Sequence, residues 1–427
     1  MKAKKLLSIS ILGLSLSSAV QAGELADIYN LALTNDPQLK AAQASYKAGS
    51  EVEVQSRAAL LPNVALSANT TSIDAETASY NNHGYTLSLS QPVFDASAWF
   101  SFKQGQALSE QAALQFELEQ QNLILRTVEA YLGVLRANSA LATSEAQERA
   151  IKRRLDQVNA QFEVGLIANT DVQEAQASFD NARVARISAE GDLDNSYEAL
   201  ERLTGQSYAG ISKLSNDYPI AEPTPTLPQP WLEKAWQGNL GLKIADQNTE
   251  AARRAAKAAH AGHYPTLSVT ASHDYDEGTA VSDNSNETNS IGLTFSMPIF
   301  SGGATSSKSR ELEQRLIEAQ QNREDTLRSV TQSTRSLLRN LRTGALSVQA
   351  LKQSIKSSQT ALEATEEGYK VGTRNVVDVL QAEQQLYASQ LEYANARFDF
   401  VQNLVTFKQQ LGTLSPDDIN ELDGWLE

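Results

Sequence analysis

In the stretch Tyr369–Leu386, which reads YKVGTRNVVDVLQAEQQL, one helical pattern ends and another begins. The first pattern is interrupted at Val371-Gly372-Thr373, and the second resumes by about Val376. Glycine adopts a left-handed or strained turn at low steric cost, so this tripeptide predicts a tight reversal between two helices. The stretch therefore predicts the tip of a helical hairpin.

A second stretch of the same kind occurs earlier in the chain, at Gln161–Gln176, which reads QFEVGLIANTDVQEAQ. The two stretches align at a single offset of 207 residues (372 − 165). The aligned pairs are Val164/Val371, Gly165/Gly372, Asp171/Asp378 and Val172/Val379. A constant offset between matching segments indicates an internal duplication, with one hairpin turn in each half.

Both turns resemble the periplasmic helical turns of the TolC family of outer-membrane efflux and secretion channels. The resemblance covers essentially the whole chain, including its leader. Its further segments are, in order, NDPQLKAA, LLPNVALSAN, LSLSQPVFD, HYPTLSVTAS, IGLTFSMPIFSGG and NARFDFVQNLVTFKQQLGTL. It implies a trimer with four membrane strands per chain, and partners in the form of a periplasmic adaptor and an inner-membrane RND-type pump or ABC transporter.

The composition restricts the class of protein independently. The 427 residues carry a formal net charge of −15, which argues against nucleic acid as a partner because nucleic acid requires a basic face. The chain contains no cysteine. A disulfide framework, a thiolate zinc site and a cysteine lipid anchor are therefore excluded.

The N-terminus has the pattern of a secretory signal peptide at residues 1–22. Three lysines within residues 2–5 precede the apolar run Leu6–Leu16, and Val20-Gln21-Ala22 supports cleavage after Ala22. This run is too short to span a membrane, and no later stretch offers the roughly eighteen apolar residues of a membrane helix. An exported chain of this kind can span a membrane only with strands.

Strand patterns follow the first helical region, which is broken at Asn35-Asp36-Pro37 and ends at Pro62. We expect strands at Asn63–Ile73 and His83–Phe94, joined by a polar loop at Asp74–Asn82. In the second strand one face carries Tyr85, Leu87 and Leu89, and the other carries Thr86, Ser88 and Ser90.

This strand pattern recurs 206 residues later (298 − 92, comparing Pro298 with Pro92). Leu267, Val269 and Ala271 alternate with small polar residues, as do Ile291, Leu293, Phe295 and Met297. We expect a polar loop between these two strands, at Asp276–Thr288.

Such strands fit either a soluble sandwich or a membrane barrel, because barrel signals are weak per strand. The export signal and the strand lengths, near the roughly 9–11 residues that cross a bilayer, favour the barrel. Four strands cannot close a barrel, so copies must pool them. Eight strands from two copies would be filled by side chains, whereas twelve strands from three copies leave room for water.

Long helices connect the strands to the turns, since no proline occurs from Val93 to Tyr218 or from Ile299 to Ser415. Ala96–Phe162 predicts one helix of roughly 100 Å at 1.5 Å per residue. Seam positions at heptad spacing are Leu114, Leu118, Gln121, Leu125, Val128, Leu132 and Leu135, then Val172, Ala175, Phe179 and Ala182 after the first turn, and Val379, Ala382, Leu386 and Ser389 after the second. Two hairpins, each joined to a strand hairpin, favour a thin-walled coiled-coil tube over a plain two-stranded coiled coil.

The expected fold is an α+β membrane protein with an internal two-fold sequence repeat. A first repeat spans 23–210, with a β-hairpin at 63–94 and helices at 96–162 and 170–204. A proline-rich connector, 211–230, leads to a second repeat at 231–412, with a β-hairpin at 264–300 and helices at 303–370 and 375–411. The C-terminal segment, 413–427, is expected to pack beside the connector, outside the tube.

Other candidate sites have weak signals. His260, His263, His273 and His83 lack acidic or sulfur neighbours with metal-ligand spacing, so we expect no metal or other cofactor. Asp274-Tyr275-Asp276 begins like a calcium loop, but Thr279 and Ser285 stand where glycine and glutamate are required. Ser301-Gly302-Gly303 predicts a strand-to-helix turn. No nucleophile–base pair has supporting spacing, so we expect no enzymatic activity.

The residues at the two turns are the candidate functional site. Ordinary helix capping explains an aspartate such as Asp171 or Asp378 beside a helix N-terminus. The resemblance implies more. It implies that Tyr369 and Arg374 bond to Thr170 and Asp171 and hold the periplasmic entrance shut, and that Asp378 contributes to an acidic, cation-selective ring. Gln381 stands where known members carry a second aspartate, so a double acidic ring is not expected.

Together these patterns predict a trimeric outer-membrane channel-tunnel that extends into the periplasm. It would be the passive exit duct of tripartite efflux pumps or type I secretion, anchored in outer membrane lipid. The alternative from another class is a periplasmic adaptor or coiled-coil scaffold that does not span a membrane. The strand faces distinguish the channel from the scaffold, because a scaffold has no need for four alternating segments with Ser and Thr on one side.

Overall fold

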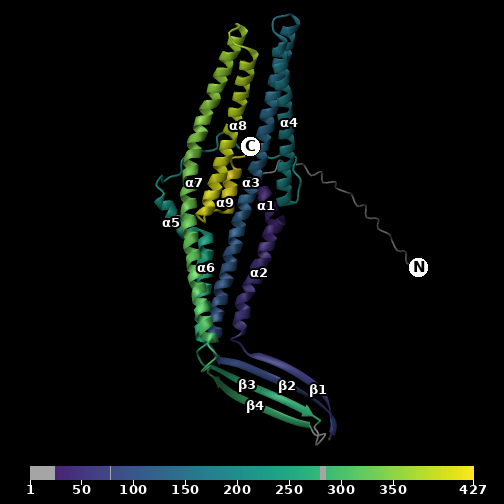
Figure 1. The fold of residues 1–427 in the computed structure, drawn as a ribbon, viewed down its shortest axis with the longest axis vertical. Coiled ribbons are helices and arrows are strands. Elements are labelled where there is room, and N and C mark those ends of the chain that lie inside the picture. Colours follow the sequence, from purple (N-terminus) through teal and green to yellow (C-terminus); the bar gives the residue numbers. More distant parts are fainter. Residues whose placement is uncertain (1–24, 77, 279–284) are drawn as a thin grey trace, which may run out of the picture.

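The computed structural model describes residues 25–76, 78–278 and 285–427. The expected signal peptide lies outside the described residues. Long helices stand on one end of a four-stranded antiparallel sheet, and two helical hairpins project at the opposite end (Figure 1). The first half contributes α1 (Leu25–Asn35), α2 (Pro37–Ala58), α3 (Ala96–Glu163) and α4 (Asn169–Thr204). The second half contributes α5 (Gln229–Gly238), α6 (Leu240–Ala261), α7 (Ala304–Lys370), α8 (Val376–Gln410) and, at the C-terminus, α9 (Pro416–Asp423).

The four long helices begin and end within one residue of the expected positions. α3 is continuous over 68 residues and α7 over 67. All seven seam residues of α3 are buried or half-buried, as are those of α4 and α8. The polar seam residue Gln121 donates its side-chain amide to the backbone carbonyl of Leu414, 3.1 Å away.

The helix boundaries follow local chemistry. Pro37 is the first residue of α2, where proline is tolerated, and the Asp36 carboxylate caps this helix by accepting the backbone N–H of Gln38 at 3.0 Å. Asn239 caps α6 in the same way, accepting the N–H of Leu242 at 3.0 Å. Each cap marks where a short helix meets a longer one.

The sheet contains β1 (Asn63–Ala75), β2 (Ala78–Phe94), β3 (Thr266–Glu277) and β4 (Ser285–Ser296), in that spatial order. The loop expected at Asp74–Asn82 was wrong, because most of it is paired strand with Ile73 opposite Tyr80. The loop expected at Asp276–Thr288 was also too long, since Tyr275 pairs with Glu287. Backbone pairing extends through mostly polar residues such as Asp74, Asn81 and Asn286, so hydrophobic alternation does not mark these ends. Residues 279–284 lie outside the described residues.

The strand register places apolar side chains on one face. Leu87 pairs with Leu66 on one side and with His273 on the other, and Leu293 pairs with Val269. The exposed apolar residues of this face are Val64, Leu66, Tyr85, Leu87, Leu89, Ile291, Leu293 and Phe295. The opposite face carries Ser, Thr, Gly and Asp residues, as the alternation predicted. Two turn glycines with positive φ, Gly302 and Gly303, then lead from the sheet into α7.

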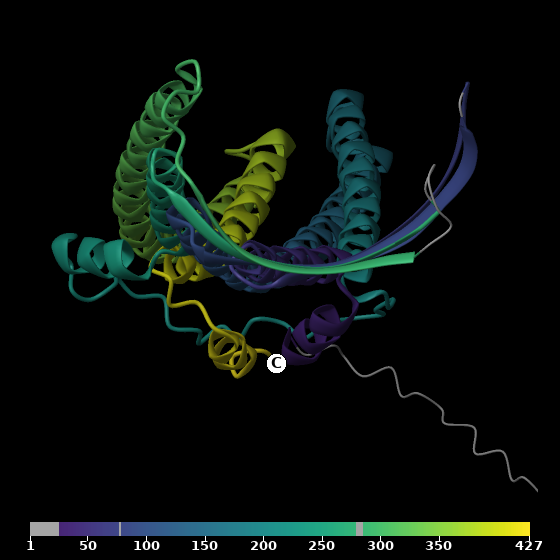
Figure 2. The same cartoon turned by 90° about the horizontal axis from the view of Figure 1, so that it is seen from below.

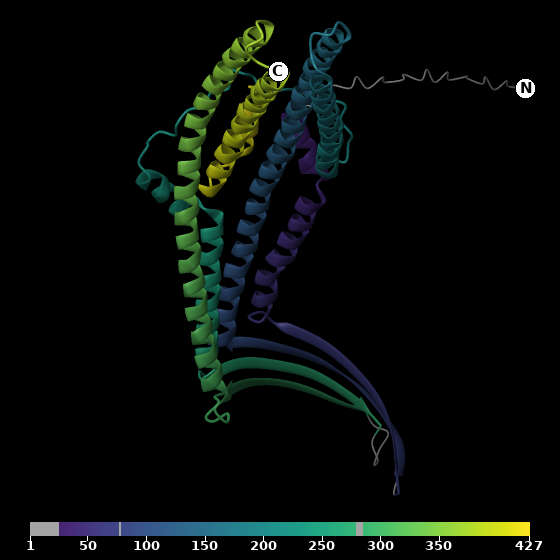
Figure 3. The same cartoon turned by 45° about the horizontal axis from the view of Figure 1, so that its top comes forward.

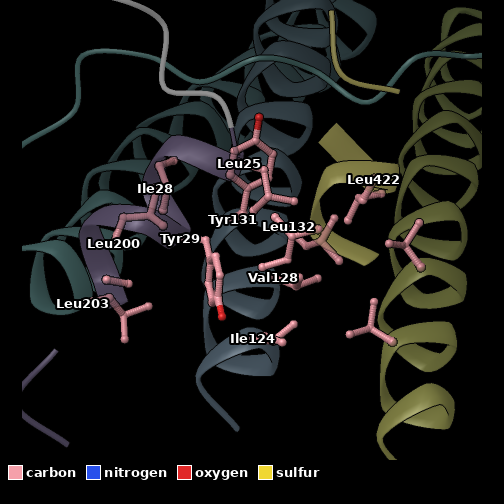
Figure 4. Close-up of a cluster of buried hydrophobic side chains, with 14 of the residues drawn as sticks. Leu25, Ile28, Tyr29, Ile124, Val128, Tyr131, Leu132, Leu200, Leu203 and Leu422 are labelled. Carbon is pink, nitrogen blue, oxygen red and sulfur yellow. The ribbon is translucent and has the colours of Figure 1, made fainter. Parts of the chain in front are cut away.

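Among the described residues, the largest apolar core lies where α1, α3, α4, α8 and α9 meet, and Figure 4 shows part of it. Leu25 and Ile28 from α1, Tyr131 and Leu132 from α3 and Leu200 from α4 are almost completely buried there. This core fixes the lower parts of both hairpins, whereas the tips extend beyond it (Figure 3).

The connector and the C-terminal segment pack against each other, as expected. Lys213 and Glu427 exchange two backbone hydrogen bonds of 2.8 Å, and the N–H of Ser215 donates to the carbonyl of Trp425. Seen from below (Figure 2), the connector, α5, α9 and α1 lie on the convex side of the curved layer. In the described ranges, no helix is both long and apolar enough to cross a membrane.

Candidate functional site

Both hairpin tips end their first helix in the same backbone motif. Gly165 and Gly372 have φ of 75° and 77°, a left-handed conformation that a side chain would strain. At the first tip, the N–H of Gly165 donates to Phe162 and that of Leu166 donates to Gln161, both at 2.9 Å. The corresponding bonds at the second tip join Gly372 to Tyr369 at 3.1 Å and Thr373 to Gly368 at 2.9 Å. These are Schellman motifs, and they confirm the predicted reversals.

The second helices of the two hairpins restart differently. Asn375 caps α8 by accepting the N–H of Asp378 at 2.8 Å, and the Asp378 carboxylate accepts the N–H of Asn375 at 3.2 Å. This is a reciprocal capping box. At the equivalent position before α4 stands Ala168, which provides no side-chain cap. The aspartate of the first hairpin, Asp171, donates its backbone N–H to the carbonyl of Ala168 at 3.2 Å, and its carboxylate forms no capping box with Ala168.

Tyr369 lies between the two hairpins but does not bond to the expected residues. Its hydroxyl donates to Oε1 of Gln161 on α3, at 2.6 Å. Burial raises the pKa of Tyr369 above its ordinary value, and the nearby carboxylate of Asp171 raises it further. Within the described part of one chain, no hydrogen bond joins Tyr369 to Thr170 or Asp171.

Arg374 also has different neighbours within the chain from those expected. Its side chain lies over Gly368, where an added Cβ would meet Arg374 Cγ at 2.8 Å. Its nearest ion-pair partner is Asp378, 4.0 Å away, and the side chain is 60% exposed. No ion pair joins Arg374 to Asp171 among the described residues. Within a single chain the expected latch is therefore not made, and the exposed side chain of Arg374 is accessible to another molecule.

Asp378 and Gln381 occupy the first turns of α8. Asp378 is half-buried and already engaged in the capping box, whereas Gln381 is exposed. Gln381 and Gln384 line a groove of about 560 Å³ between α8 and the α3/α4 hairpin, opposite Glu174. Gln381 therefore contributes polarity at this position but no charge.

A buried ionic cluster joins the two hairpins below their tips, and sequence reasoning missed it. Arg154 on α3 contacts Glu366 on α7 at 2.5 Å and Glu383 on α8 at 3.1 Å. Arg154 is 11% exposed and Glu383 is 7% exposed. Burial raises the pKa of Glu383 above its ordinary value, and this effect outweighs the attraction of Arg154. Three helices are thus connected through one guanidinium.

The histidines and the aspartate considered above as metal ligands lie away from the Arg154 cluster. His260 and His263 form an edge-to-face contact at the end of α6, with ring centroids 6.1 Å apart. Among the described residues, no group of three or more metal-ligating side chains converges on one point. Asp274 accepts hydrogen bonds from Thr86 and Ser272, both at 2.7 Å, within the sheet.

This architecture is shared with a known protein family. The family model described as "Outer membrane efflux protein" matches residues 28–206 and again residues 231–413. The chain is 37% identical over 436 residues to outer membrane protein TolC of Vibrio cholerae serotype O1, covering 99% of both chains. It is 30% identical over 415 residues to the alkaline protease secretion protein AprF of Pseudomonas aeruginosa, covering 92% of this chain and 85% of that protein.

The fold also matches solved structures. The outer membrane protein VceC from Vibrio cholerae superimposes with a TM-score of 0.80 at 19% identity, over 91% of this chain and 96% of that chain. The sheet, the paired hairpins and both halves of the sequence agree with the same assignment. The chain belongs to the outer membrane efflux protein family.

Proposed function

We propose that three copies of the chain form one channel, in which each copy adds four strands to a twelve-stranded barrel and two hairpins to a helical tunnel. The observation that supports this most strongly is that β1 and β4 are the two edges of the sheet. In lipid, the unpaired backbone groups of an edge have no water to bond to, so a spanning sheet must close on itself. Pairing β4 of one copy with β1 of the next removes every edge.

The exposed apolar face of the sheet supports a lipid contact. Leu66 is 71% exposed, Ile291 82% and Leu293 66%, although leucine and isoleucine are usually buried. A contiguous apolar face of this kind marks a contact with lipid or with another protein. The strands have 12 to 17 residues, enough to cross a bilayer when tilted. The polar face would then line the water-filled interior.

As a member of this family, the protein is an outer membrane transport protein and not an enzyme. It serves as an exit duct for efflux and type I secretion, reaching from the outer membrane into the periplasm. The alternative of a scaffold that does not span the membrane has no support from these relatives. A passive duct needs a source of energy elsewhere, and we propose a periplasmic adaptor and an inner-membrane RND-type or ABC transporter as partners.

The hairpin tips are the proposed periplasmic gate. Within each copy, Arg154 holds α7 and α8 against α3, and Tyr369 adds its bond to Gln161. Because the exposed Arg374 is not bonded to Thr170 or Asp171 of its own chain, we propose that it reaches those two residues on the neighbouring copy. Three copies of Asp378 would then surround a narrow opening and favour cations.

The internal duplication is the proposed origin of the two hairpins. One family model matches both halves, and Schellman motifs occur at Gly165 and Gly372, one in each half. We accordingly propose structural repeats at 23–210 and 231–412, with the connector at 211–230 between them and a C-terminal segment at 413–427.

The experiment that tests this function is fractionation followed by electrophoresis. Outer membranes from cells expressing the chain should contain a species of three times the monomer mass that dissociates to monomer only on heating. A chain recovered in the soluble periplasmic fraction, or as a heat-insensitive monomer, would contradict the proposal.

A further inference from the structure

Arg397 on α8 is a buried cation whose hydrogen bonds go to uncharged groups. Its side chain is part of a residue only 6% exposed. Nη1 donates to Oδ1 of Asn216 at 3.0 Å, and Nη2 donates to the backbone carbonyl of Ser215. The guanidinium carbon lies 5.7 Å from the centre of the Tyr393 ring. All of these neighbours are neutral.

Three partly buried arginines at other helix interfaces, Arg126, Arg154 and Arg186, are each paired with two carboxylates. Arg126 contacts Asp36 and Glu119, each at 2.6 Å. Arg154 contacts Glu366 and Glu383. In the described ranges no carboxylate oxygen lies within 4.0 Å of a nitrogen of Arg397. Burying a charge without a counter-charge is unfavourable, so Arg397 is the exception that needs an explanation.

A cavity of about 350 Å³ lies beside this guanidinium. It is bounded by α3, α8, the start of the connector and the C-terminal residue, and Arg397 lines it. Besides Arg397, the lining residues whose side chains carry hydrogen-bond donors are Asn138, Ser139, Lys213, Ser215, Asn216 and Tyr393. Lys213 adds a second positive charge. Two of the donors at this cavity, on Arg397 and Lys213, are cationic, and cationic donors suit an oxyanion.

The acidic residue at this cavity is Glu427. Its backbone is held by the two hydrogen bonds to Lys213, so the residue stays at the cavity wall. Its side chain makes no ion pair with Arg397 or Lys213 within 4.0 Å in the described structure. Among the described residues Arg397 therefore has no carboxylate within ion-pair distance, although Glu427 lines the same cavity.

We propose that this cavity binds a small oxyanion, of the carboxylate or phosphate class, through the guanidinium of Arg397. The guanidinium has five N–H groups in a planar fork, of which Asn216 and Ser215 accept two, so others remain to bind the oxygens of an anion. Lys213 and the hydroxyl of Ser139 would complete the contacts from the connector and from α3. The bound anion would join α3, α8 and the connector at the base of the hairpins. This site is independent of the proposed gate.

Isothermal titration of the purified full-length protein tests the site. Sodium phosphate and sodium acetate are titrated separately into protein in sodium chloride, at constant ionic strength. We expect saturable binding of at least one of the two anions at one site per chain, and the pair distinguishes phosphate from carboxylate. Arg397→Gln should weaken that binding at least tenfold. Arg342→Gln, at an exposed arginine paired with Glu222 at 3.3 Å, is the matched control and should bind as wild type does.

Two further variants keep the result decisive if Arg397→Gln fails to fold. Lys213→Gln and Ser139→Ala should each weaken binding several-fold while leaving the fold intact, because both residues lie at the cavity wall. Glu427→Gln should bind at least as tightly as wild type. The proposal is overturned if neither anion binds wild type saturably, if binding survives Arg397→Gln or both wall variants unchanged, or if binding appears only in Glu427→Gln. That last result would identify Glu427 as the counter-ion.

Discussion

The guanidinium of Arg154 on α3 lies 3.1 Å from the carboxylate of Glu383 on α8, although the two residues are 229 positions apart in the chain. This pair joins the first hairpin to the second at a buried position. Opening the entrance by moving α7 and α8 away from α3 must break it. The cluster formed by Arg154, Glu366 and Glu383 therefore determines how firmly the second hairpin is held.

Removing the cation of this cluster should loosen the second hairpin. Arg154→Gln removes the ion-pair partner of Glu366 and Glu383, and breaking a buried pair in this way costs roughly 3–5 kcal/mol. Hydrogen exchange followed by mass spectrometry should show faster exchange of the α8 backbone near Glu383. Arg149→Gln is the control, because Arg149 pairs with Glu145 on the exposed surface. Equal exchange in both variants would show that the buried cluster does not hold the hairpin.

The pH dependence of the cluster follows from the raised pKa of Glu383. A carboxyl whose pKa is higher in the folded protein binds more protons there than in the unfolded chain, so stability falls as pH rises from its ordinary pKa towards the raised one. Glu383→Gln cannot ionise and should escape this loss. Below about pH 4.5, the α8 backbone amides of the variant and of wild type should exchange at the same rate. Above this pH, the α8 amides of wild type should exchange faster than those of the variant. Slower exchange of wild type at the higher pH would contradict the assignment.

The two hairpins offer a reciprocal test of capping. Asn375→Ala removes the side-chain cap of α8 and should cost roughly 1 kcal/mol. Ala168→Asn should add a similar amount to α4, because Ala168 already has the extended backbone of a capping residue, with φ of −83° and ψ of 156°. Hydrogen exchange of the backbone amides at each hairpin tip measures the loss of stability in Asn375→Ala and the gain in Ala168→Asn. A destabilised first tip in Ala168→Asn would mean that the site cannot accommodate a cap.

The sheet faces can be tested by side-chain chemistry. Leu293→Arg places a charge on the proposed lipid face and should impair membrane assembly, at a cost of roughly 2–4 kcal/mol if it lies near mid-bilayer. Cysteine replacing Thr294, which is on the opposite face, should react with a small aqueous thiol reagent. The chain has no cysteine of its own to interfere. Faster reaction of cysteine at Leu293 than at Thr294 would reverse the assignment of faces.

The hairpins and their turns could be predicted from sequence because local signals specify them. Each left-handed turn requires a glycine, and the sequence supplies Gly165 and Gly372. The absence of proline permits the long helices. The strand ends could not be predicted, since residues such as Asn81 and Asn82 pair through the backbone with no apolar side chain to mark them. Arg154 and Glu383 were missed because charges in a heptad pattern look like surface residues until the packing of α3 against α8 is known.

In the proposed acidic ring, Asp378 has two roles: it caps α8 and it places a negative charge at the opening. Its carboxylate already caps α8, so Asp378→Asn should reduce cation preference and trivalent-cation block while keeping the cap, because asparagine also accepts hydrogen bonds. Gln381 adds no second charge, so block of the wild type should be weaker than in a relative with two acidic residues. Reversal potential and block in a planar bilayer measure this. Unchanged values in Asp378→Asn would place the constriction elsewhere.

Single-channel conductance in a planar bilayer tests the central claim most directly. The purified protein should insert as discrete channels of low conductance if the hairpin tips close the entrance as we propose. Tyr369→Phe combined with Arg374→Ser removes the proposed polar contacts of both side chains in all three copies. A hydrogen bond to a charged group contributes roughly 1.5–3 kcal/mol. Conductance should then rise while the trimer remains intact on unheated gels. No channels from the wild type, or the same conductance with and without the two substitutions, would contradict a trimeric duct gated at its tips.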